Sequence, residues 1–288
     1  MALYPDFKRL YGREAPATGS VIWLPFLDGN VVVGGSGNGY RLLTEAPQLS
    51  LTEAPLLLGH RSVAAYVTCE LPTAATLPTG QRAVDLRTLH GYIDELDWAI
   101  AGYAAHILHW RRTSGYCPVC GAEMGPLQAE WMRECTRCAH QRYPQVSPAV
   151  LALVHDGGDR VLLAHKPGWG QRYSIPAGFV LPGESLEECV HREVEEEVGV
   201  RVTDLVYQGS QPWPFPHQLM VGFSARFVSG EIRLDEQELD HAAWFDVHDL
   251  PPLPPVLSLS RQMLDSWTNK RMAAESSDVR PQNHGLST

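Results

Sequence analysis

A short acidic segment offers the clearest chemistry in this sequence. Glu193, Glu196 and Glu197 are three and four residues apart, so on a helix their carboxylates share one small patch. Like charges at this spacing destabilise a bare helix by roughly 0.2–0.5 kcal/mol per pair, and a divalent cation such as Mg²⁺ or Mn²⁺ would offset that repulsion and bridge to phosphates. The preceding Arg192 can orient a carboxylate through a forked hydrogen bond. A solvated acidic face is the alternative, and the spacing alone does not decide between the two.

Four cysteines indicate a second and different metal site. Cys117 and Cys120 form one pair, and Cys135 and Cys138 form another after fourteen intervening residues. Each pair places two sulfurs on one tight turn, so two facing turns supply four thiolates to a tetrahedral Zn²⁺. Because protein would fill all four positions, we expect this zinc to be structural. Two redox-active pairs or four free thiols are the alternatives, and a redox pair has no need of a second copy at this distance.

The elements that must position these residues form two α/β regions on either side of the cysteines. Before them, VIWLPF and VVVGG read as β segments, and a helix is predicted from Tyr92 to about Arg112. His106 and His109 on that helix have no evident third ligand, so we interpret them as ordinary helix positions. After the cysteines, a helix from about Ser185 to Val198 lies among several β candidates. These are AVLALV, RVLLAHK, LMVGFSARFV, EIRL and AAWFDV.

These patterns predict four segments. Residues 1–112 form an N-terminal α/β domain, 113–144 a zinc ribbon, 145–268 the domain that carries the acidic helix, and 269–288 a polar, disordered tail. We expect the unpaired Cys69 and Cys189 to be small buried apolar residues.

Composition narrows the class of protein. The 288 residues are 44% hydrophobic with a net charge of −10, which argues against a protein that coats nucleic acid or anionic membrane. An anionic substrate would therefore need positive charge that the site supplies locally. The sequence has no apolar run of about 20 residues and no secretory pattern at its start, so we expect a cytoplasmic protein that does not enter a membrane.

The acidic segment resembles the Nudix hydrolase box. Gly178, Glu184, Arg192-Glu193-Val194, Glu196-Glu197 and Gly199-Val200 occupy its defined positions with the box's spacing. The resemblance implies an α/β/α sandwich with a mixed sheet and hydrolysis of a nucleoside diphosphate linked to another group. It also implies metal binding by Glu193, Glu196 and Glu197. One of the last two is expected to serve as general base, and spacing does not separate a base from a ligand.

A second segment narrows the substrate. In Ser210–Met220, prolines alternate with aromatic residues, so a stiff strip could expose flat rings to a base or pack them into the core. It is similar to the SQPWPFP motif of the NADH pyrophosphatase (NudC-like) subfamily, which also carries a four-cysteine ribbon between an N-terminal domain and the Nudix domain. The resemblance implies cleavage of NADH or NAD to nicotinamide mononucleotide and AMP, removal of NAD caps from RNA 5′ ends, and a homodimer.

The same resemblance implies further site residues. Phe179 is a candidate for base stacking, Tyr143 is expected to help from the partner subunit, and Glu238 would be a fourth metal carboxylate. Gln218 stands where the subfamily usually has serine, which puts the ranking of substrates in doubt. The other candidate substrate contacts are Gln211, Trp213 and Phe215.

Two rival functions stay open. A Nudix enzyme with another specificity would hydrolyse ADP-ribose or diadenosine polyphosphates. A catalytically silent Nudix domain would bind protein or RNA through its ribbon, and the intact box carboxylates argue against that reading.

Overall fold

The chain forms two compact units. The computed structural model describes residues 3, 5–11, 19–36, 39–49, 51 and 53–278. One unit comprises Met1–Val146 with Pro212–Gln218, and the other comprises Ser147–Gln211 with Leu219–Thr288. The borders predicted from the sequence at 112/113 and 144/145 stay a prediction.

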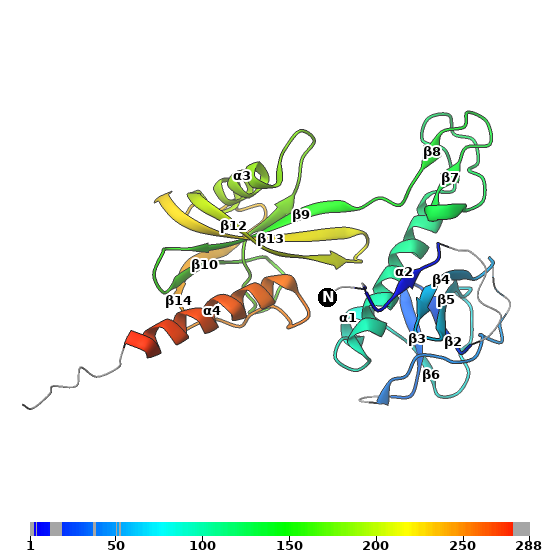
Figure 1. Ribbon diagram of the computed structural model, residues 1–288. Coiled ribbons are helices and arrows are strands. Elements are labelled where there is room, and N and C mark those ends of the chain that lie inside the picture. The colour runs from blue at the N-terminus through cyan, green and yellow to red at the C-terminus, as the bar shows by residue number, and fades with distance from the viewer. Residues whose placement is uncertain are drawn as a thin grey trace, which may run out of the picture. The chain divides into compact units, whose positions relative to one another are not determined.

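A sheet and a long helix make up most of the N-terminal unit (Figure 1). The strands lie in the order β1-β4-β5-β2-β3-β6, and β2 and β5 run parallel between antiparallel neighbours. The strands are β1 (Lys8–Arg9), β2 (Val21–Leu27), β3 (Asn30–Gly34), β4 (Leu56–Arg61), β5 (Ala64–Glu70) and β6 (Gln81–Val84). A short α1 (Leu86–Leu89) precedes α2 (Glu95–Thr113), which confirms the predicted helix. The Asp94 carboxylate begins α2 by accepting two backbone N–H groups.

The cysteine segment packs on α2 through two tryptophans. It contains a short helix η2 (Ala129–Trp131) and the hairpin of β7 (Arg133–Glu134) and β8 (Gln141–Arg142). The Trp131 indole donates to the Tyr103 hydroxyl at 2.6 Å, and the Trp110 indole donates to the carbonyl oxygen of Trp131 at 2.9 Å. These bonds fix the segment to one end of the helix.

The second unit is an α/β/α sandwich. Its sheet has the order β12-β13-β9-β10-β14, with β11 paired to β9. The strands are β9 (Ser147–His155), β10 (Arg160–His165), β11 (Ala177–Phe179), β12 (Val200–Trp213), β13 (Gln218–Gly230) and β14 (His241–Asp246). Figure 1 shows α3 (Leu186–Val198) on one face of the sheet and α4 (Leu259–Asp278) on the other.

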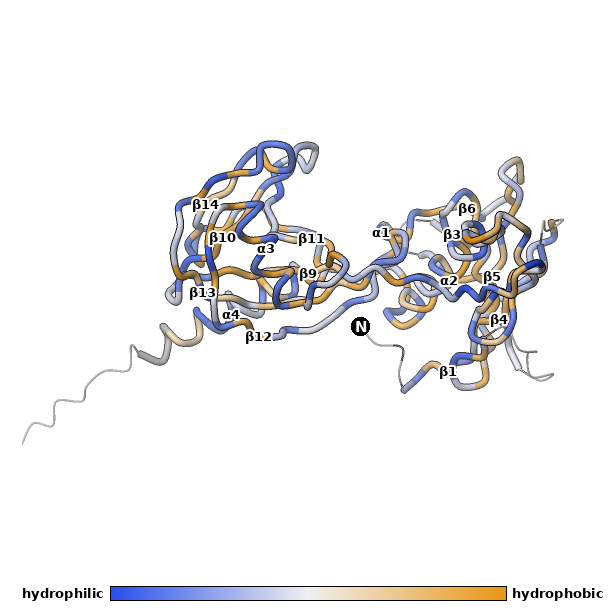
Figure 2. The backbone as a smooth tube through the Cα atoms, turned by 90° about the horizontal axis from the view of Figure 1, so that it is seen from above, coloured by the Kyte–Doolittle hydropathy of each residue, from blue (hydrophilic) through white to orange (hydrophobic). Residues whose placement is uncertain are grey.

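Alternating side chains of the central strands build both cores. From β9, Val150 and Ala152 join the cluster that contains α3, whereas Leu151 and Leu153 join the cluster that contains α4. This is the period of two expected for a strand buried on both faces, and it explains the continuous apolar run visible along β9 in Figure 2. The buried Cys189 belongs to the first cluster, and Cys69 is buried in the N-terminal unit, as predicted.

Two sequence predictions are wrong in this unit. The segment EIRL is not a strand, because it runs beside the end of α3 instead of a neighbouring strand. The Arg233 N–H donates to Val198 and that of Asp235 donates to Glu197, while Ile232 and Leu234 pack on the core. The tail also does not start at 269, because α4 continues to Asp278 and Arg271 donates to the Gly157 carbonyl oxygen at 2.8 Å. The rest of the predicted tail, 279–288, lies outside the described residues.

No helix within the described ranges is long and apolar enough to cross a membrane.

Candidate active site and metal centre

Local sequence fixes both ends of the acidic helix α3. Ser185 and Glu188 form a capping box, in which each side chain accepts the backbone N–H of the other residue. At the other end Gly199 adopts a left-handed φ of 75°, and its N–H donates to the Glu195 carbonyl oxygen. Both features agree with the predicted helix from about Ser185 to Val198. The register of the glutamates is therefore set before any metal is considered.

The box glycine makes room for the first carboxylate. A Cβ on Gly178 would lie 1.8 Å from Cδ of Glu193 and about as close to both of its carboxylate oxygens. Gly178 is the middle residue of β11, which packs against α3. Any side chain there would displace Glu193, so the strand and the helix can approach this closely only with glycine.

Arg192 holds three box carboxylates together. Its guanidinium donates to Glu184 at 3.0 Å, to Glu193 at 2.7 Å and to Glu196 at 3.0 Å. It also donates to the Phe179 carbonyl oxygen at 2.9 Å. The hydrogen bond from Arg192 lowers the pKa of Glu184 to about 2, and the same contacts raise the pKa of Arg192. Arg192 thus orients more carboxylates than the single one predicted.

Glu197 faces a different cation. Its side chain is buried, with one oxygen 2.9 Å from the Lys166 ammonium and the other accepting the Ala177 N–H at 3.2 Å. Burial raises the pKa of Glu197, and the charge of Lys166 opposes that rise. The same ammonium donates to Glu238 at 2.9 Å, so the predicted fourth carboxylate does join this group. The sequence analysis did not identify Lys166.

The donor set fits hard divalent cations. Glu193, Glu196, Glu197 and Glu238 offer carboxylate oxygens, the ligands that Mg²⁺ and Mn²⁺ prefer. Their ligand atoms do not all converge within 4.8 Å, because Arg192 and Lys166 hold them in two groups. By contrast, Glu195 pairs with Arg201 at 3.2 Å, away from both groups. Glu195 was not predicted as a metal ligand, and its position on the helix keeps it apart from the glutamates that were.

The four cysteines converge as a zinc site requires. They form the one group of candidate ligands in the described part of the chain whose ligand atoms all lie within 4.8 Å of one another. The sulfurs of Cys117 and Cys138 are 3.7 Å apart, and those of Cys120 and Cys135 are 3.5 Å apart. A tetrahedral site with Zn–S bonds of about 2.3 Å separates its sulfurs by roughly 3.8 Å. The pKa of Cys120 is lowered to about 6, chiefly by the Ala122 N–H, which favours the thiolate.

The proline-rich strip is the turn between β12 and β13. Its aromatic side chains pack on the N-terminal unit, where the Arg87 guanidinium carbon lies 3.6 Å from the Phe215 ring centroid. Trp213 meets Phe215 edge to face at 5.0 Å, and a Cβ on Gly102 of α2 would be 3.1 Å from Pro214. Both rings are half-buried. Packing into the core, the alternative to stacking on a base, therefore accounts for the buried part of both rings.

The remaining predicted substrate contacts differ from one another. Phe179 is 49% exposed at the end of β11, and Tyr143 is 50% exposed after β8. Gln218 is the first residue of β13. Gln211 is 3% exposed, donates to the Leu257 carbonyl oxygen and accepts the Leu259 N–H. Both ends of its amide thus hold the start of α4, and the contact of Gln211 with substrate stays a prediction.

The two histidines of α2 do gain a third. The His217 ring centroid lies 6.2 Å from that of His106 and 5.3 Å from that of His109. Burial lowers the pKa of His106 and of His109, and His106 Nε2 lies 2.8 Å from the Gln145 carbonyl oxygen. The imidazole nitrogens do not converge within 4.8 Å as the cysteine sulfurs do. The interpretation as ordinary helix positions stays a prediction.

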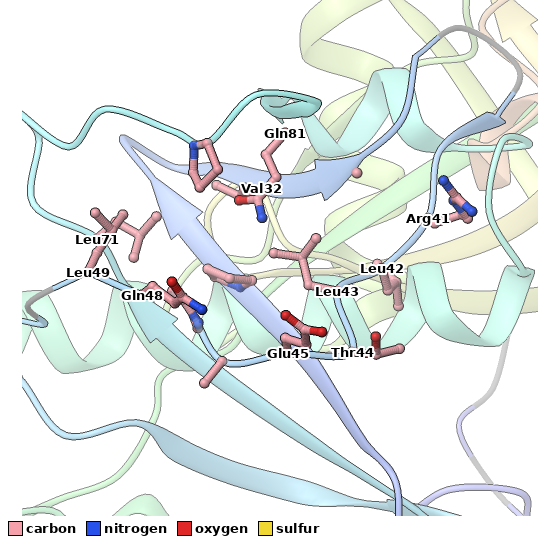
Figure 3. Close-up of a pocket in the computed structure, with 15 residues that line it drawn as sticks. Val32, Arg41, Leu42, Leu43, Thr44, Glu45, Gln48, Leu49, Leu71 and Gln81 are labelled. Atoms are coloured by element: carbon pink, nitrogen blue, oxygen red, sulfur yellow. The ribbon is translucent and has the colours of Figure 1, made fainter.

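A cavity of about 510 Å³ lies in the N-terminal unit (Figure 3). Val32, Leu43 and Leu71 give it an apolar floor, and Arg41 and Gln48 are exposed on its rim. None of its lining residues is a predicted site residue. Its size alone does not connect it with the carboxylates or the cysteines.

Comparison with known families covers most of the chain. Residues 20–110 match the NADH pyrophosphatase-like rudimentary NUDIX domain, and 112–143 match the NADH pyrophosphatase zinc ribbon domain. Residues 146–266 match the NUDIX domain. The three matches follow one another in the order that the resemblance implied.

Curated relatives match over a similar length. The NAD-capped RNA hydrolase NudC of Pseudomonas aeruginosa is 42% identical over 240 residues, which is 81% of this chain and 85% of that protein. The NAD-capped RNA hydrolase NudC of Pseudomonas putida is 41% identical over 216 residues, covering 74% of this chain and 77% of the relative.

The cysteine cluster predicts one tightly held zinc per chain. Replacing Cys135 with alanine is expected to remove that zinc and to lower the melting temperature, because the ribbon turns lose the bond that joins them. Elemental analysis and thermal melts of the purified protein measure both effects. Cys69→Ala is the matched control, since Cys69 is a free buried thiol outside the cluster, and it should keep its zinc. Full zinc content in Cys135→Ala would contradict the assignment.

The Arg192–Glu184 pair predicts a pH-dependent stability. Folding lowers the pKa of Glu184 from 4.5 to about 2, so its contribution is complete above pH 4.5 and is lost as pH falls toward 2. The melting temperature of Glu184→Gln should therefore fall below that of the wild type by a constant amount above pH 4.5. The gap should narrow between pH 4.5 and 2.

Glu187→Gln, on the exposed first turn of the same helix, is the control and should show no such narrowing. A gap for Glu184→Gln that is independent of pH across this window would count against the pair.

Proposed function

Since this chain belongs to the Nudix hydrolase family and carries the domain set of its NADH pyrophosphatases, we propose that it hydrolyses the diphosphate of NADH and NAD. The products are nicotinamide mononucleotide and AMP. The same bond occurs in NAD-capped RNA, so the proposal includes removal of that cap from 5′ ends. The observation that carries it is the set of box carboxylates that Arg192 orients beside the strand of Gly178.

The surroundings of each carboxylate suit it to a different chemical role. Glu193, Glu197 and Glu238 are the proposed ligands of Mg²⁺ or Mn²⁺ together with Glu196. Such ions polarise a phosphoryl oxygen and lower the pKa of a bound water. Both oxygens of Glu197 are already fixed, by Lys166 and by the Ala177 N–H, which suits a ligand. Glu196 is 61% exposed and contacts Arg192 through one oxygen, which suits the transfer of a proton.

Substrate recognition is proposed for the exposed aromatic residues. The Phe179 ring stands at the end of β11, the strand that makes room for Glu193, so a base stacked on it would lie beside the carboxylates. We propose Trp213, Phe215 and Gln218 as further contacts to substrate. Tyr143 is proposed as a contact from the partner subunit of a homodimer.

The cellular setting follows from the substrates. Dinucleotides and capped RNA are made inside the cell, which supports a cytoplasmic enzyme. With a net charge of −10 the chain is suited to bind the end of an RNA and not its length.

A parallel substrate panel tests the activity. The wild type with Mg²⁺ or Mn²⁺ should release AMP from NADH and NAD. From NAD-capped RNA it should release nicotinamide mononucleotide and leave an RNA with a 5′ monophosphate. Glu196→Gln should lower kcat on the order of 10²-fold or more, because the amide does not accept the proton. Product analysis by chromatography measures both. Equal or faster turnover of ADP-ribose or a diadenosine polyphosphate would overturn the NADH assignment.

Glu195→Gln is the matched control for this panel. It neutralises a neighbouring glutamate of the same helix that pairs with Arg201, so its kcat should stay near that of the wild type. If Glu196→Gln is as active as this control, the silent-domain alternative or a contaminating enzyme is favoured.

The homodimer is tested by mass. Light scattering on the purified protein should give twice the chain mass of 31.9 kDa. Tyr143→Ala should raise KM for NADH without changing that mass, because the residue is proposed to contact substrate across the dimer. A protein that stays monomeric at micromolar concentration would remove both proposals.

A further inference from the structure

One lysine side chain lies between two of the proposed metal ligands. The Lys166 ammonium is 2.9 Å from a carboxylate oxygen of Glu197 and 2.9 Å from one of Glu238. The chain has three lysines, at 8, 166 and 270, so this is an uncommon residue type here. Arg192, the other cation of the site, instead contacts Glu184, Glu193 and Glu196.

The backbone next to Lys166 is held firmly. It follows directly on β10, and the preceding His165 pairs with Asp240 and also contacts the Gly170 carbonyl oxygen at 2.8 Å. The Asp240 N–H in turn donates to the His165 carbonyl oxygen at 3.1 Å. These bonds join the end of β10 to the turn that carries Glu238. The lysine is therefore placed by the fold and does not reach the glutamates as a freely moving surface side chain.

Burial explains why a cation is needed at this place. The Glu197 side chain is 4% exposed and that of Lys166 is 28% exposed, whereas that of Glu238 is 56% exposed. A buried carboxylate without a partner is costly, and Glu193 on the same helix adds repulsion to Glu197. The ammonium supplies the opposite charge at the point where the oxygens of two different elements meet.

We propose that Lys166 is a positioning residue that stands in for a catalytic cation. In the metal-free protein its ammonium holds Glu197 and Glu238 in place, and a divalent ion that binds both carboxylates must displace it. This inference rests on the proposed function, which makes these glutamates metal ligands. The positive charges of an ammonium and a divalent ion repel at such short range, so the lysine weakens metal binding while it holds the two carboxylates in place.

The test compares Mn²⁺ binding with and without the ammonium. In the zinc-loaded full-length protein without substrate, Lys166→Met should bind Mn²⁺ about tenfold more tightly by titration calorimetry. The metal-free variant should melt at a lower temperature than the wild type, because Glu197 loses its partner. Saturating Mn²⁺ should then raise its melting temperature by more than it raises that of the wild type.

Three further variants make the result decisive. Lys270→Met removes the same charge from an exposed position on α4 and should bind Mn²⁺ as the wild type does. Lys166→Gln tests the same point should the methionine variant fail to fold. Lys166→Arg keeps the charge and should restore the weaker binding.

Two different failures can be told apart. Unchanged or weaker Mn²⁺ binding in the neutral Lys166 variants, with Glu197→Gln still reducing binding, overturns the role of the lysine alone. If Glu197→Gln binds Mn²⁺ as well as the wild type, the proposed metal site itself is wrong.

Discussion

The candidate site depends on one guanidinium that keeps several carboxylates close together. Without Arg192, Glu184, Glu193 and Glu196 would repel one another across a single turn-sized patch. Its contacts satisfy oxygens on both sides of the loop that leads into α3, and the carbonyl oxygen of Phe179 receives one of them. Gly178 provides the space for this arrangement, because Glu193 occupies the position that a Cβ would need. Electrostatics and sterics thus select the same geometry.

The two cations of the site act in different ways. Arg192 is a planar fork that donates to three carboxylates and to the Phe179 carbonyl oxygen, so it fixes directions. Lys166 is a compact charge between Glu197 and Glu238, so it fixes a position without demanding a geometry. In a protein with a net charge of −10, these two groups supply positive charge locally, beside the carboxylates.

Sequence reasoning identified what is encoded locally. The helix from about Ser185 to Val198 and the cysteine pairs each follow from a few neighbouring residues, and the structure has both. It missed what depends on distant partners. Lys166 contacts Glu238, which lies 72 residues away in the sequence. The Gln211 amide holds Leu259, 48 residues away, a structural role that the sequence did not indicate. The segment EIRL at 231–234 alternates charged and apolar residues as a strand does, yet its backbone N–H groups donate to the end of α3.

The turn between β12 and β13 has a consequence for how the chain is made. Its residues 212–218 belong to the N-terminal unit, although the strands that carry them belong largely to the other. On the ribosome, helix α2 with Gly102 and His109 therefore emerges long before Pro214 and His217 can cover it. The first unit is complete only when much of the second has been synthesised. If the gene were divided after Val146, the N-terminal fragment would lack residues 212–218. The other fragment would carry these residues without the unit on which they pack.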